Sequence, residues 1–207
     1  MLKIYGRANS INVRKVLWTC EEIGLPFERE DWGRGFQPTS DPQFQSLSAY
    51  GVIPVIDDDG FVLRESQAIV RYLLAKHKRT DLLPDELKAR ATVEAWMDWA
   101  AVDVYSDMRP VIHGLMFKTP GYDDPDRIQA GIEGWTVHMH RLDAELAANG
   151  PYLMGDTFTA ADIPTGLNVN RWFAIPFDKP KLAAVDAYFA RLKERPAFMK
   201  HGANGMP

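Results

Sequence analysis

The sequence predicts a protein of two domains, a small α/β domain followed by an all-helical domain. Strand and helix patterns follow one another as strand, helix, strand and then strand, strand, helix within the first 76 residues. A charged stretch that ends in Leu82-Leu83-Pro84 is typical of a linker, and no strand pattern follows it. We therefore place the domains at residues 1–76 and 88–207, with a linker at 77–87.

The first three elements form a βαβ unit. Residues Leu2–Tyr5 alternate as a strand, and Phe27–Asp31 is expected to be a second, short strand. Between them an apolar stripe recurs at helical spacing, formed by Val13, Val16, Leu17, Cys20 and Ile23. Since Cys20 lies on this stripe, we expect it to be a buried core residue.

The next elements form a ββα unit. Two short apolar runs, Val55-Ile56 and Phe61-Val62-Leu63, flank an acidic turn that ends in glycine, which predicts an antiparallel hairpin. Pro54 opens the first strand, where proline is tolerated and can be cis. Ser66 precedes an amphipathic stripe and is expected to cap a helix. With Glu65, it marks a helix N-terminus that suits a carboxylate ligand.

The helical half contains three strong signals. Ala89–Phe117 is one long helix or a broken one, with a kink predicted at Pro110. An amphipathic helix follows, with apolar residues spaced by three and four positions from Ile128 to Leu146. Thr159 and Asp162 resemble a capping box, and Phe158 with Ile163 fits a hydrophobic staple around it. The tail from Gly202 is expected to be frayed.

Composition narrows the class of protein. The 207 residues are 46% hydrophobic and 25% charged, which is ordinary for a globular chain, and the net charge of −4 argues against binding to nucleic acid or an anionic membrane. One cysteine excludes an intrachain disulfide and a zinc site built on cysteines. The histidine spacing predicts no metal site. No signal peptide or membrane span is evident, so we expect a soluble, cytoplasmic protein.

Four motifs together resemble the cytosolic glutathione S-transferases, in particular bacterial serine-type members similar to the theta, delta and phi classes. They are Tyr50-Gly51-Val52-Ile53-Pro54, Glu65-Ser66, Phe158-Thr159-Ala160-Ala161-Asp162 and Arg195-Pro196-Ala197. The resemblance implies a thioredoxin-like N-terminal domain, glutathione as co-substrate and a homodimer. It also implies that Ile53 and the cis Pro54 face the cysteinyl part of glutathione, while Glu65 and Ser66 grip its γ-glutamyl amine and carboxylate.

The resemblance also points to the group that activates the thiol. Ser10-Ile-Asn-Val-Arg14 is similar to the serine-type classes, in which a hydroxyl at the start of the first helix donates to sulfur and stabilises the thiolate. Without the resemblance, Ser10 would be read as a helix cap. Tyr5 and the amides of Asn9 and Asn12 are alternative donors.

The long loop Trp32–Leu47, with a turn of helix near Pro42–Leu47, is expected to meet the glycine carboxylate of glutathione. Gln37 is our choice there, with Arg34 and Gln45 as alternatives.

These residues predict a transferase that joins glutathione thiolate to a hydrophobic electrophile. The helical domain would line the pocket for that substrate, with candidates Trp99, Tyr105, Met108, Arg109, Met116 and Phe117. Two alternatives stay open. One is glutathione-dependent isomerisation, dehalogenation or peroxide reduction on the same fold, and the other is a non-catalytic glutathione-binding or ligand-binding scaffold.

Overall fold

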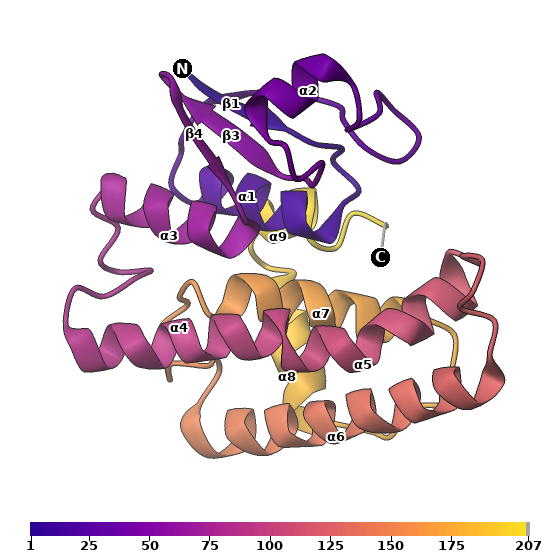
Figure 1. Cartoon of the computed structure of the whole chain (residues 1–207). Coiled ribbons are helices and arrows are strands. Elements are labelled where there is room, and N and C mark those ends of the chain that lie inside the picture. The colour runs from indigo at the N-terminus through magenta and orange to yellow at the C-terminus, as the bar shows by residue number, and fades with distance from the viewer. Residues whose placement is uncertain (206–207) are drawn as a thin grey trace. The chain divides into compact units, whose positions relative to one another are not determined.

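A computed structural model describes residues 1–205, and the chain falls into two compact units (Figure 1). The first, the N-terminal unit, contains residues 1–85 together with the C-terminal residues 196–205. The second, the helical unit, contains residues 86–195. The sequence analysis assigns residues 196–205 to the helical domain, but they pack in the N-terminal unit because they contact its first helix.

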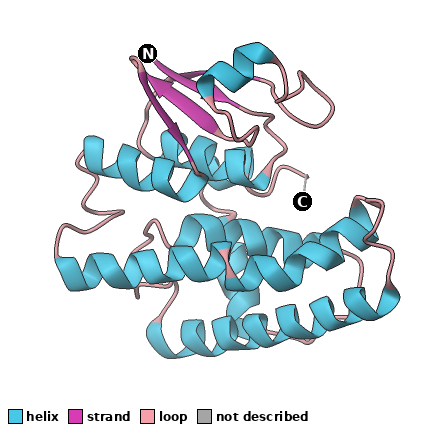
Figure 2. Cartoon of the chain, in the orientation of Figure 1, coloured by secondary structure: helices cyan, strands magenta, loops and turns pink. Residues whose placement is uncertain are grey.

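The N-terminal unit has a four-stranded sheet with the order β2-β1-β3-β4. Its strands are β1 (Leu2–Tyr5), β2 (Phe27–Glu30), β3 (Val55–Asp58) and β4 (Phe61–Arg64). Strands β1 and β2 are parallel, whereas β1 with β3 and β3 with β4 are antiparallel. Its helices are α1 (Ile11–Glu22), α2 (Pro42–Leu47), α3 (Ser66–Lys76) and α9 (Pro196–His201). Figure 2 shows the sheet in magenta, and the predicted βαβ-ββα order is confirmed.

Helices α1 and α3 cover one face of this sheet and α2 lies on the other (Figure 1). The larger core cluster joins side chains of β1, α1, β3 and α3, among them Ile4, Val13, Val16 and Ile69. A smaller cluster on the α2 side contains Tyr5, Trp32, Phe44 and Val55. Neighbouring strand residues such as Ile4 and Tyr5 point to opposite faces, so each face acquires its own core.

The helical unit contains α4 (Leu87–Ala101), α5 (Asp103–Val111), a π-helix η1 (Ile112–Met116), α6 (Pro125–Asn149), α7 (Asp162–Ala174) and α8 (Ala183–Leu192). Helix α7 is buried along almost its whole length, and α4 and α8 both pack against it. Helix α5 packs along α6 (Figure 1). Within residues 1–205, no helix is both long and apolar enough to cross a membrane.

The predicted long helix is broken, and the break does not lie at Pro110. Helix α4 ends before Val102, whose φ of −110° lies outside the helical range, and α5 starts at the next residue. Pro110 remains inside α5, and the chain widens into η1 directly after this helix. Because proline has no N–H, the hydrogen bond that Pro110 fails to make is the one to the carbonyl oxygen of Ser106, which lies within α5.

The tail is not frayed at its start. Gly202 is buried, and the Arg14 side chain of α1 donates hydrogen bonds to the carbonyl oxygens of His201 and Gly202. The expectation is therefore wrong for this part of the tail, because a side chain distant in the sequence satisfies its backbone. Residues Met206 and Pro207 lie outside the described residues.

The capping motif of α7 is built around the buried carboxylate of Asp162. Asp162 Oδ2 accepts hydrogen bonds from the backbone N–H of Thr159 at 2.8 Å and from its hydroxyl at 3.3 Å. Asp162 Oδ1 accepts from the N–H of Leu153 at 3.2 Å and from the Tyr188 hydroxyl at 3.0 Å. The predicted bond from Asp162 back to residue 159 is thus present, but the capping box is incomplete, because the residue before α7 is Ala161 and the Thr159 side chain does not cap the helix. The same carboxylate also binds the loop at Leu153 and the Tyr188 side chain of α8.

Burial raises the pKa of Asp162 from its ordinary value of 3.8 to about 6. Between these values the folded protein holds a proton that the unfolded chain has released, so this group contributes less to the free energy of unfolding as the pH rises. We expect the stability difference between wild type and Asp162→Asn to shrink, by up to roughly 3 kcal/mol, from pH 4 to pH 7. Urea unfolding of both proteins across this range measures the difference. A constant difference would mean that Asp162 stays ionised throughout.

Candidate functional site

The register of the sheet brings four loops to one edge of the N-terminal unit. Tyr5 at the end of β1 pairs with Glu30, Val55 pairs with Tyr5, and Arg64 pairs with Val55, so these residues form one row across the sheet. The segments beyond this row therefore leave the sheet at the same edge. They carry Ser10, the loop after β2, the Ile53-Pro54 pair and the Glu65-Ser66 pair.

Ser10 stands immediately before α1, with φ −86° and ψ 127°, and its side chain makes no capping hydrogen bond. Ser10 therefore occupies the N-cap position of α1, but its hydroxyl does not cap the helix, and the interpretation of this hydroxyl as a plain helix cap is wrong. The residue is 9% exposed, so its hydroxyl lies in a nearly closed environment at the positive end of the helix. Hydrogen-bond donation to an anion is the chemistry that this position supports.

The loop before α1 approaches the sheet closely at Gly6. This glycine has a φ of +151°, and a Cβ atom there would lie 2.6 Å from the Val13 side chain and 3.2 Å from Ile53. A residue with a side chain would push the start of α1 away from the sheet. Gly6 thus fixes the separation between the Ser10 turn and the Ile53 loop.

The alternative donors are occupied to different degrees. Asn9 Oδ1 accepts a hydrogen bond from Arg7 at 2.6 Å, and Asn12 Oδ1 accepts one from Lys15 at 3.0 Å. Both bonds use the amide oxygen and leave the amide nitrogen as a donor. Tyr5 differs, because it is 6% exposed and packs in the cluster with Trp32 and Phe44. Burial is the main cause that raises the pKa of its phenol.

The peptide bond between Ile53 and Pro54 is cis, as the sequence suggests. Ile53 is half-buried and contributes to both core clusters of this unit. Its side chain lies near Gly6 and Gly33, so packing holds the loop that precedes β3. The backbone of Ile53 is consequently a fixed element of the edge.

The Glu65-Ser66 pair begins α3, but the capping residue is Glu65 and the prediction that Ser66 caps the helix is wrong. Glu65 has a φ of +71°, which a residue with a side chain adopts only under strain. Its carboxylate accepts a hydrogen bond from Arg64 at 2.9 Å and is 64% exposed. Ser66 is buried in the first turn, so its hydroxyl and the exposed carboxylate of Glu65 lie together at a helix N-terminus.

The loop after β2 places Gln37 at the surface, with its backbone oxygen accepting from Gly33 at 2.8 Å. Gln45 donates to the Thr39 carbonyl at 2.6 Å, which occupies its side chain within the loop. Arg7 also lies beside this loop, although no sequence motif points to it, and its Nε lies 3.7 Å from the position of a Cβ on Gly33. Burial and then the nearby charge of Arg34 lower the pKa of Arg7. Arg7 and Arg34 thus both add positive charge to the loops at this edge, and positive charge there favours an anion.

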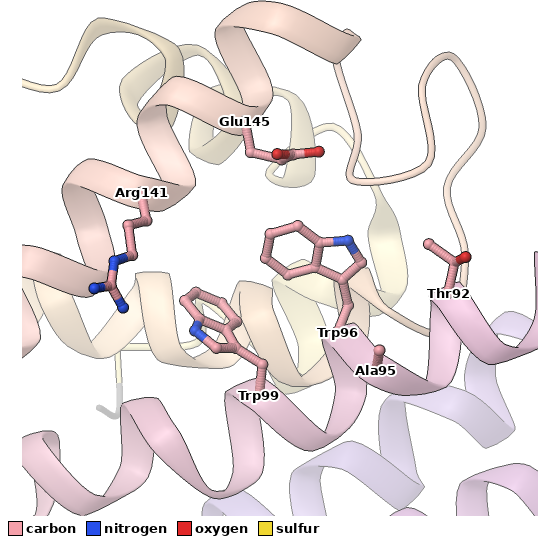
Figure 3. A pocket seen from close by; sticks show the side chains of 6 residues that line it. All are labelled: Thr92, Ala95, Trp96, Trp99, Arg141 and Glu145. Atoms are coloured by element: carbon pink, nitrogen blue, oxygen red, sulfur yellow. The ribbon is translucent and has the colours of Figure 1, made fainter.

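In the helical unit, Trp99 lines a groove whose lining contains none of the α5 residues proposed beside it. Together with Trp96 it lines this groove of about 410 Å³ between α4 and α6, and Figure 3 shows Arg141 and Glu145 of α6 on the opposite side. Of the other candidates, Met108 is fully buried, whereas Tyr105 and Met116 are half-buried and Phe117 is 36% exposed.

Two further predictions concern reactive and metal-binding groups. Cys20 is completely buried, as predicted, and burial raises the pKa of its thiol to about 12, so it is not a nucleophile at neutral pH. Among residues 1–205, histidine, cysteine and acidic side chains form no group of three that could hold a metal ion.

Comparison with known proteins gives consistent relatives across the whole chain. A family model for the N-terminal domain of glutathione S-transferases matches residues 4–81. Glutathione S-transferase GstB of Escherichia coli (strain K12) is 35% identical over 202 residues, which are 97% of each chain. The crystal structure of a theta class glutathione S-transferase from Xanthomonas axonopodis pv. citri with glutathione bound is 37% identical. It has a TM-score of 0.89 and covers 97% of this chain and 96% of that chain.

The backbone at Glu65 gives a direct test of strain at this edge. Glu65→Gly and Glu65→Ala both remove the carboxylate and its bond to Arg64, but only glycine adopts a positive φ without strain. We expect Glu65→Gly to be more stable than Glu65→Ala by about 1 kcal/mol. Urea unfolding midpoints measure the difference, and equal midpoints would show that position 65 stores no strain.

Proposed function

The chain belongs to the glutathione S-transferase family, and we propose that it transfers glutathione to hydrophobic electrophiles. The thiol first loses its proton, because the thiolate is the nucleophile. Its sulfur then attacks an electrophilic carbon, so that a carbon–sulfur bond forms while the bond to the leaving group breaks. The leaving group departs with the electron pair of that bond.

The row from Tyr5 through Val55 to Arg64 is the observation that carries this proposal. Two strand spacings separate β1 from β4, on the order of 10 Å. Three extended residues span about the same length. An extended tripeptide along this edge would therefore reach from the Ser10 turn, past Ile53, to the start of α3.

Ser10 is the residue that we assign to thiol activation. Its hydroxyl is unused by α1, is almost enclosed and stands at the positive end of a 12-residue helix. A hydrogen bond from this hydroxyl to sulfur stabilises the thiolate relative to the thiol and lowers the thiol pKa. Asn12, in the first turn of α1, keeps an amide nitrogen that supports the same anion.

The γ-glutamyl end of glutathione is assigned to the start of α3. Its carboxylate would accept hydrogen bonds from the Ser66 hydroxyl and from backbone N–H groups of the first turn. Its ammonium group would pair with the exposed Glu65 carboxylate. The Ile53 backbone, held before the cis Pro54, would pair with the cysteinyl part between these ends.

The glycine carboxylate is assigned to the loop after β2. Gln37 is exposed there, and the neighbouring guanidinium groups of Arg7 and Arg34 add positive charge. A carboxylate binds an arginine more strongly than a neutral amide, since the bond is charge-assisted. We therefore add Arg7 and Arg34 to Gln37 as binding residues.

The remaining assignments concern the setting of the reaction. Half-buried or exposed Tyr105, Met116 and Phe117 supply apolar surface for a hydrophobic electrophile.

We further propose a homodimer, because Tyr50, Phe61 and Val62 of the N-terminal unit are 68%, 49% and 40% exposed. One free, buried cysteine fits a cytoplasmic location. The role in detoxification that we propose follows from the conjugation of hydrophobic electrophiles.

The role of Ser10 is tested by the ultraviolet absorbance of bound glutathione thiolate as the pH is varied. In the wild type we expect a thiol pKa well below the ordinary value of ~8.5, and in Ser10→Ala a rise of roughly 1 to 2 units with little change in glutathione affinity. Tyr5→Phe is the matched control and should leave the pKa unchanged. A rise in Tyr5→Phe but not in Ser10→Ala would transfer the role to Tyr5.

The carboxylate assignment is tested by glutathione binding. Arg7→Gln should weaken glutathione affinity by roughly tenfold, the loss expected for one charge-assisted hydrogen bond, whereas Gln37→Ala should weaken it less. Arg79→Gln, at an arginine of the same unit that pairs with Asp81, is the matched control. Isothermal titration with glutathione and with its glycine amide separates the cases. If Arg7→Gln weakens binding of both ligands equally, Arg7 does not contact the carboxylate.

A further inference from the structure

The last described residues of the chain pack against α1, which also packs on the sheet. Phe198 of α9 packs on Trp18 of α1, with ring centroids 4.8 Å apart. Lys200 donates to Glu21 at 2.8 Å at the surface. A Cβ on Gly202 would lie 2.0 Å from the Phe198 ring, so the chain turns tightly there. We call residues 196–204 the C-terminal segment.

Arg14 is the polar centre of this contact. Its Nε donates to the carbonyl oxygen of His201 at 2.5 Å, and its Nη2 donates to the carbonyl oxygen of Gly202 and, at 3.3 Å, to Oδ1 of Asn204. The side chain is 1% exposed. Burial lowers its pKa to about 10, so the guanidinium stays charged at neutral pH. A buried cation thus holds three oxygen atoms of the C-terminal segment.

This contact lies one helical turn from Ser10. The N–H of Arg14 donates to the carbonyl oxygen of Ser10 at 2.9 Å, which closes the first turn of α1. One turn corresponds to about 5 Å along the helix axis. On its other side the same part of α1 packs on the sheet through Val13 and Val16. The turn that carries Ser10 is therefore fixed from both sides.

We propose that Arg14 is a positioning residue for Ser10. By binding the C-terminal segment it holds the first turn of α1 in the place from which the Ser10 hydroxyl donates to the glutathione sulfur. The proposal rests on the proposed role of Ser10. It assigns a part in thiol activation to residues 201–204, which are almost two hundred positions away in the sequence.

Three variants separate this geometry from other effects. Arg14→Met removes the fork of donors and keeps an apolar stem, whereas Arg14→Lys keeps the charge but cannot reach three oxygens in the same way. Truncation after Lys200 keeps every residue of α1 and removes the acceptors. Lys200→Ala is the matched control, because it removes the surface ion pair of the same segment and leaves the Arg14 contacts.

The experiment is the thiolate titration of bound glutathione, together with steady-state kinetics and circular dichroism. We expect Arg14→Met, Arg14→Lys and the truncation each to raise the thiol pKa by about one unit and to lower kcat about tenfold, because one turn of helix has lost its support. The KM for glutathione should change by less than about twofold, since the α3 and Ile53 contacts remain. Lys200→Ala should match the wild type.

The outcomes are distinct. If Ser10→Ala raises the thiol pKa but the truncation and Arg14→Lys do not, the positioning role of Arg14 is wrong while that of Ser10 stands. If Arg14→Lys keeps the wild-type thiol pKa while Arg14→Met raises it, the positive charge at position 14 lowers the thiol pKa and the contact with the C-terminal segment does not. This result also overturns the proposal. If Ser10→Ala leaves the pKa unchanged, the role of Ser10 fails and the proposal fails with it. Should Arg14→Met misfold, the truncation decides.

Discussion

The packing of α1 against the sheet is the constraint on which the N-terminal unit depends. The helix supplies Val13, Val16 and Leu17 to the larger core cluster, and its first turn carries Ser10. The closeness of this contact requires a glycine at position 6, because Val13 occupies the space of a side chain there. The same helix thus supplies core side chains and positions Ser10. A substitution that shifts α1 relative to the sheet therefore also shifts the Ser10 hydroxyl.

The features that the sequence predicts well are those with a local cause. The strands and the helices α1 and α3 follow from the spacing of apolar residues, which depends only on neighbours in the chain. The Ile53-Pro54 pair and the Glu65-Ser66 pair could be located because each flanks such an element. The link between Asp162 and Thr159 is also local, since both partners lie within one helical turn.

The features that escaped prediction depend on residues far apart in the sequence. The helix breaks at Val102, where neither a proline nor a glycine predicts a break. Pro110, where a kink is predicted, lies inside α5. The positive φ of Glu65 results from joining β4 to α3 in a fixed geometry, not from a residue that favours it. Arg14 looks like an ordinary charged residue of a helix, because its acceptors belong to a segment near the other end of the chain.

The place of the C-terminal segment in the N-terminal unit has a consequence for biosynthesis. Residues 1–85 leave the ribosome before the helical unit, and the helical unit is translated before residues 196–204. Until then Trp18 lacks its Phe198 partner and the guanidinium of Arg14 lacks its backbone acceptors. The first turn of α1 therefore acquires its contacts with the C-terminal segment only after the helical unit has been translated.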